Sequence, residues 1–89
     1  MSKEISDQFH NAMLGISDAA LQLTPPYPAK LFLRMVQEHG GKLAADKLLA
    51  TPQPSQGFTE LFLRGKENLR LSVEYLVLQN PWRTLFTGE

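Results

Sequence analysis

The apolar residues near the start of the chain recur at helical spacing. Alternating steps of four and three positions separate six of them: Ile5, Phe9, Ala12, Ile16, Ala19 and Leu23. Such spacing places these side chains on one face of a helix, and polar residues fall between them. Thr24 precedes Pro25, and a residue before proline avoids helical dihedral angles. We therefore predict an amphipathic helix over about residues 3–23, followed by a stiff proline-rich connector at 25–28 that swings this helix away from the rest.

Three shorter apolar patterns follow the connector. Pro28 suits the start of a second helix, and the Gly40-Gly41 pair after His39 suits its end. A third helix is predicted over about residues 42–50, with a proline-containing loop after it. Ser55 is a good N-cap for a fourth helix over 56–64, in which Phe58, Leu61 and Phe62 would face the core.

The segment LRLSVEYLVL at 69–78 fits two patterns. Its apolar residues alternate as in a strand, but Val73, Leu76 and Val77 also share a helical face. We choose a helix, because a lone strand would leave its backbone groups unpaired and because Ser72 and Glu74 favour a helix start. Asn80 and Pro81 then begin a last turn, whose apolar residues close the core: Trp82, Leu85 and Phe86.

The fold class predicted is all-α, a small bundle of five or six short helices with a longer amphipathic helix at the N-terminus. Residues 1–24 form that helix, 25–28 the connector and 29–89 a compact helical module. With 89 residues and 10.0 kDa, these parts together make one domain.

The composition limits the cellular compartment and the classes of partner that we expect for the protein. Nine Lys and Arg balance nine Asp and Glu, so no overall basic excess marks a nucleic-acid or membrane-surface binder. The chain has no cysteine, which fits a reducing compartment, and no segment with the pattern of a secretory signal or a membrane span. We expect a cytoplasmic protein without a membrane partner.

No catalytic motif is present in the sequence. The two histidines, His10 and His39, have no second metal ligand at suitable spacing, and we expect His10 to be solvated. Neither a nucleophile with its base nor a phosphate-binding glycine loop is present. We expect no enzyme activity, no cofactor and no metal.

Binding is the class of function that remains, and a protein partner is the first version. The apolar stripe of the first helix would dock on another protein or on a second copy of the chain through Phe9, Ile16 and Leu23. The alternative for this helix is that it folds back over the others as core. Both interpretations bury the same three residues.

Nucleic-acid binding through a helix-turn-helix-like unit is the alternative function. The predicted third helix would lead into the fourth, which would read the nucleic acid. Residues 29–70 hold more basic than acidic side chains, although Glu60 would oppose phosphates and the 51–55 loop is long for this motif. The residues assigned to this alternative are Lys42, Lys47, Gln56, Arg64, Lys66 and Arg70.

The region from Pro28 to Glu89 carries a set of short motifs: EHGG, AADKLL, PSQGFTELFLRG, LSVEYLVL and LFTGE. With these motifs it resembles a helical module found in many uncharacterised bacterial proteins. The resemblance covers about two thirds of the chain and implies a helical fold. It implies no reaction, because the family has no assigned activity and the shared glycines and prolines act in helix ends and turns.

Overall fold

A computed structural model describes residues 2–50, 53 and 55–86 of the chain. Within these residues the secondary structure is entirely helical and contains no strand, which confirms the all-α prediction. The elements are α1 (Ser2–Leu21), α2 (Lys30–His39), α3 (Gly41–Leu49), α4 (Gln56–Leu63), the 3-10 helix η1 (Lys66–Leu71), α5 (Val73–Leu76) and the 3-10 helix η2 (Trp82–Phe86).

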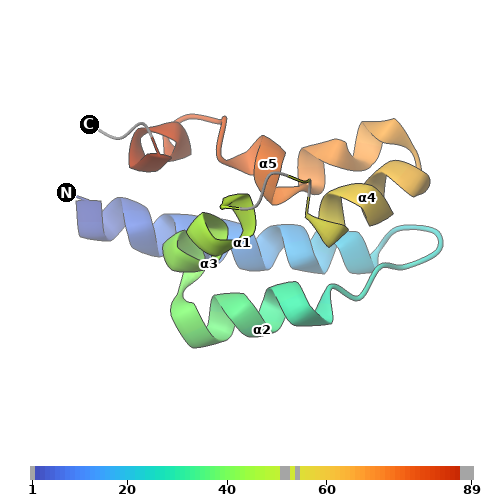
Figure 1. Cartoon of the computed structure of the whole chain (residues 1–89), viewed down its shortest axis with the longest axis horizontal. Coiled ribbons are helices and arrows are strands. Elements are labelled where there is room, and N and C mark those ends of the chain that lie inside the picture. Colours follow the sequence, from blue (N-terminus) through green and yellow to red (C-terminus); the bar gives the residue numbers. More distant parts are fainter. Residues whose placement is uncertain (1, 51–52, 54, 87–89) are drawn as a thin grey trace.

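Helix α1 is the central element of the bundle. It lies between α2 on one side and the segment from α4 to η2 on the other, and α3 packs on both α1 and α2 (Figure 1). The chain reverses direction after α1, where the backbone N–H of Tyr27 bonds the carbonyl oxygen of Ala20 at 3.0 Å. The prediction that the connector swings α1 away from the rest is therefore wrong: α1 folds back as core, because its apolar side chains are covered from both sides.

The core is centred on Phe9 and Met13, which are fully buried. The Phe9 ring packs edge to face against Trp82, with 5.7 Å between centroids, and against Phe86, with 5.4 Å. Such aromatic pairs add about 0.5–1.5 kcal/mol beyond the area that they bury. The last turn of the chain therefore closes the core over α1, as predicted for Trp82, Leu85 and Phe86.

Two serines begin helices in the C-terminal half. Ser55 accepts a hydrogen bond from the Phe58 backbone N–H, and Ser72 accepts one from Tyr75, both at 3.1 Å. Ser72 has extended dihedral angles and so divides the 69–78 segment into the end of η1 and the start of α5. The choice of helix over strand is confirmed, but the segment is two short helical pieces.

Helix α3 begins in close contact with α1. His10 Nδ1 accepts a hydrogen bond from the Gly41 backbone N–H at 3.0 Å, and a Cβ on Gly41 would lie only 2.6 Å from the His10 Cα. The expectation of a solvated His10 is wrong, because this ring caps the N-terminus of a neighbouring helix. Gly15, by contrast, faces open space.

Candidate binding surface

Helix α4 exposes two large apolar side chains beside its polar ones. Leu61 is buried at 2% exposure, while Phe62 and Leu63 are 54% and 71% exposed. The prediction that Phe62 faces the core is wrong, because Leu61 fills that direction and the next two residues turn outward. The sequence LFL thus supplies both a core contact and a surface.

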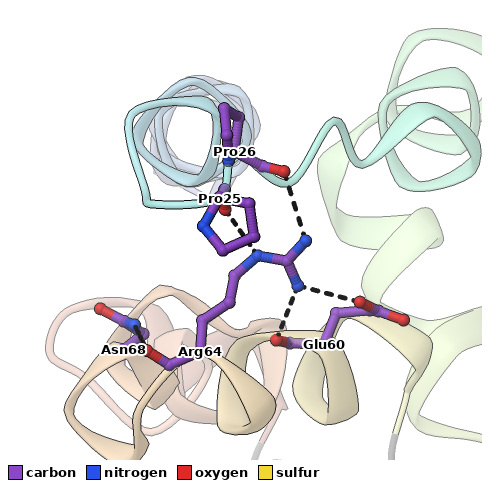
Figure 2. A network of polar contacts seen from close by, with 5 residues as sticks. All are labelled: Pro25, Pro26, Glu60, Arg64 and Asn68. Atoms are coloured by element: carbon purple, nitrogen blue, oxygen red, sulfur yellow. Dashed lines mark hydrogen bonds and ion pairs between the residues drawn. The ribbon is translucent and has the colours of Figure 1, made fainter.

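Arg64 fixes the C-terminal end of α4 to the connector. Its Nε donates a hydrogen bond to the Pro25 carbonyl oxygen at 2.7 Å, and Nη2 donates one to that of Pro26 at 3.3 Å. Nη1 donates to both the backbone and the carboxylate of Glu60, and the guanidinium lies 5.2 Å from the centroid of the Tyr27 ring. Figure 2 shows the guanidinium between the two prolines and Glu60. The side chain is only 14% exposed; its contacts with Glu60 are partly buried, whereas those with the two proline carbonyls are open to water.

A second polar contact fixes the N-terminal end of α4. The Glu74 carboxylate accepts hydrogen bonds from the Ser55 backbone N–H at 2.7 Å and from its hydroxyl at 3.1 Å. This contact joins the start of α4 to α5. Helix α4 is therefore held at both ends by charge-assisted hydrogen bonds, which are the stronger kind.

The neighbouring α5 segment also leaves apolar side chains outside. Tyr75 is 44% exposed, and Leu78, which follows the helix, is 68% exposed. Helices α4 and α5 pack against each other. We use the name α4–α5 apolar surface for four exposed side chains: Phe62 and Leu63 on α4, Tyr75 on α5, and Leu78 just after α5.

The three residues predicted to contact a protein partner lie elsewhere. Phe9 is fully buried, and Ile16 and Leu23 are partly buried. The prediction that Phe9 contacts a protein partner is wrong, because the other helices of the same chain already cover its ring. Helix α1 is instead part of the core, which is the alternative stated for it.

The six residues of the nucleic-acid alternative are not brought together as a reading helix. Helix α3 packs mainly on α1 and α2, whereas α4 packs mainly on η1. Lys42 forms an ion pair of 2.7 Å with Asp46 and lies 4.8 Å from the centroid of the Phe86 ring, and Arg64 is held by the connector. The remaining four side chains are exposed: Lys47, Gln56, Lys66 and Arg70.

The described residues contain no group of three or more His, Asp or Glu side chains that could hold a metal ion. Burial is the largest cause that raises the pKa of Tyr27 above its ordinary value of 10.0; the Glu60 carboxylate raises it further and Arg64 lowers it. This phenol is therefore neutral at physiological pH.

Among the residues that the structure describes, no helix has the length and apolar character that crossing a membrane requires.

Comparisons of the chain with protein-family models, curated proteins and solved structures find no match. The resemblance to a bacterial helical module therefore stays a prediction. A function for this protein has to be argued from its geometry.

Proposed function

We propose that the protein is a small non-enzymatic binding module that pairs with a second copy of itself through the α4–α5 apolar surface. The observation that carries this proposal is the exposure of Phe62 and Leu63 on a helix fixed at both ends. Single exposed leucines are ordinary on protein surfaces. Adjacent Phe and Leu side chains on a rigid helix, beside a second segment with exposed Tyr and Leu, are what a binding surface requires.

Rigidity strengthens this argument. Association costs free energy when side chains and backbone become ordered, and a surface that is already held loses less. Fully burying a Phe or Leu side chain is worth about 1.5–3 kcal/mol. Covering the exposed parts of the four residues of the α4–α5 apolar surface on each copy therefore offsets a substantial part of the entropy cost of pairing.

A second copy is a partner that the charges allow. The formal net charge of the chain is zero, so two copies do not repel each other as whole molecules. Lys66 and Glu67, the exposed residues just after α4, have opposite signs and cancel locally. A two-fold interface can use the same surface on both copies and then closes without further growth.

The nucleic-acid alternative has less support. Of its basic residues, Lys42 is paired with Asp46 and Arg64 is bonded to the connector. The exposed face of α4, which would have to read the nucleic acid, carries Phe62 and Leu63 instead of cations.

Sedimentation equilibrium over a range of protein concentrations tests the proposal. We expect the apparent mass of the natural chain to rise from 10.0 kDa toward twice that value. A double variant with Phe62→Ser and Leu63→Ser should stay at the monomer mass. The matched control is Leu43→Ser, which removes a side chain that is 48% exposed on α3 and should pair like the natural chain. A natural chain that remains monomeric at all concentrations, or a double variant that pairs equally well, overturns the proposal.

A further inference from the structure

A cleft lies between the connector, the start of α2 and the start of α4. It consists of two adjoining cavities, an inner one of about 30 Å³ and an outer one of about 270 Å³. Both are lined by Tyr27, Phe32, Ser55 and Gly57, so the two cavities lie side by side. None of the four residues of the α4–α5 apolar surface lines it.

The walls of the outer cavity are largely apolar. Leu31 and Leu48 add to the rings of Tyr27 and Phe32. An apolar cavity of about 150 Å³ is large enough for benzene, and pockets for drug-sized ligands begin at about 300 Å³. The outer cavity therefore fits a molecule with one ring, or an aliphatic chain of similar volume, and a short polar group.

The outer cavity has a cation at its edge. Among the described residues, Lys30 is the only charged one that lines this cavity; it is exposed and makes no ion pair with them. It begins α2, whose N-cap residue Ala29 provides no side-chain cap, so the positive end of that helix dipole is not neutralised. The nearest carboxylate to the Ser55 wall is that of Glu74, and it already accepts the hydrogen bonds that the Ser55 backbone N–H and hydroxyl donate.

We propose that this cleft binds a small organic anion, with the apolar body between Tyr27, Phe32 and Leu48 and the carboxylate beside Lys30. The apolar cavity supplies affinity, and the ammonium group of Lys30 selects an acid over a neutral molecule of the same shape. The site is independent of the pairing proposed above, because different residues form it.

An amide NMR titration of the full chain with phenylacetate, and separately with the neutral analogue 2-phenylethanol, tests this inference. We expect saturable shifts for both compounds at Tyr27, Phe32 and Gly57. Phenylacetate should bind about two- to fivefold more tightly, the range expected for one exposed ion pair. In Lys30→Gln the two affinities should become equal, whereas the control Lys47→Gln should keep the preference.

Three results would overturn the inference. The first is that neither compound gives a saturable shift at the cleft. The second is that the natural chain binds both compounds with equal affinity, and the third is that Lys30→Gln keeps the preference for phenylacetate. A Leu48→Trp variant adds an independent check, because its larger side chain should fill the cavity and remove binding of both compounds while pairing through Phe62 and Leu63 continues. A natural chain that binds phenylacetate but does not pair would reject the proposed function and leave this inference standing.

Discussion

Arg64 and Pro25 are 39 residues apart in the chain, and a 2.7 Å hydrogen bond from the arginine Nε to the proline carbonyl oxygen joins them. This bond connects the end of α4 to the turn that follows α1. A proline has no N–H to donate, so its carbonyl is the group through which this turn can be held. Together with the Ser55–Glu74 contact, this bond helps to hold α4 in the orientation that leaves Phe62 and Leu63 exposed.

Replacing Arg64 by methionine should lower the free energy of unfolding by about 1.5–3 kcal/mol, the range for hydrogen bonds to a charged group. Arg64→Lys should lose nearly as much, because a single ammonium group cannot reproduce the planar set of donors that reaches two carbonyls and a carboxylate. Urea denaturation measures the change. The control is Arg70→Met at an exposed position, and equal stability of the Arg64 and Arg70 variants would contradict the structural role of Arg64.

Two glycines should respond to alanine in opposite directions. Gly15→Ala places a methyl group in open space on α1 and should stabilise the protein by about 0.5–1 kcal/mol through helix propensity. Gly41→Ala places its Cβ 2.6 Å from the His10 Cα, and such overpacking costs about 1–3 kcal/mol. Thermal or urea unfolding of both variants measures the difference. Stabilisation by alanine at both positions would show that α1 and α3 do not approach as described.

Phe9 and Phe62 should differ sharply, although both are phenylalanines on helices. Phe9→Ala removes a fully buried ring and should cost about 3–5 kcal/mol. Phe62→Ala, at 54% exposure, should change the free energy of unfolding of the monomer by about 0.5 kcal/mol or less. Phe9→Leu, which keeps most of the volume, provides a measurable value where the alanine variant fails to fold. A larger loss at Phe62 than at Phe9 would reverse the assignment of core and surface.

The sequence was sufficient for the helical fold class because periodic apolar residues and local caps act over a few positions. Ser55 and Ser72 show this, since each bonds a backbone N–H three residues ahead. The position of α1 required long-range information: the stripe that includes Phe9 fits a partner or a core equally well. Contacts with residues far away in the chain, such as Trp82 and Phe86, decide between them.

The candidate surface was harder to predict for the same reason. Leu61, Phe62 and Leu63 are consecutive apolar residues, and their helical rotation alone leaves open which one points inward. The sequence suggests nucleic-acid binding as a role for Arg64, because no sequence pattern connects it with Pro25 and Pro26. The clustering of three prolines beside Tyr27 was the one signal that an unusual turn needed a partner.

The phenol of Tyr27 should give the protein an alkaline pH dependence. Its pKa is raised in the folded state, chiefly by burial, so the folded protein keeps the proton at a pH where the unfolded chain has lost it. The stabilisation is therefore complete below about pH 10 and is lost as the pH rises through the folded-state pKa. Unfolding measured between pH 9 and about 12 should show a decline that is smaller in Tyr27→Phe. An identical decline in both proteins would contradict the raised pKa.

The most direct test of the proposed pairing is an isotope-filtered NOE experiment on a mixture of labelled and unlabelled protein at high concentration. We predict intermolecular contacts between the Phe62 ring of one copy and the Leu63 methyl groups of the other. Intermolecular contacts that instead involve α1 residues such as Leu23, or no intermolecular contacts at all, would contradict pairing through the α4–α5 apolar surface.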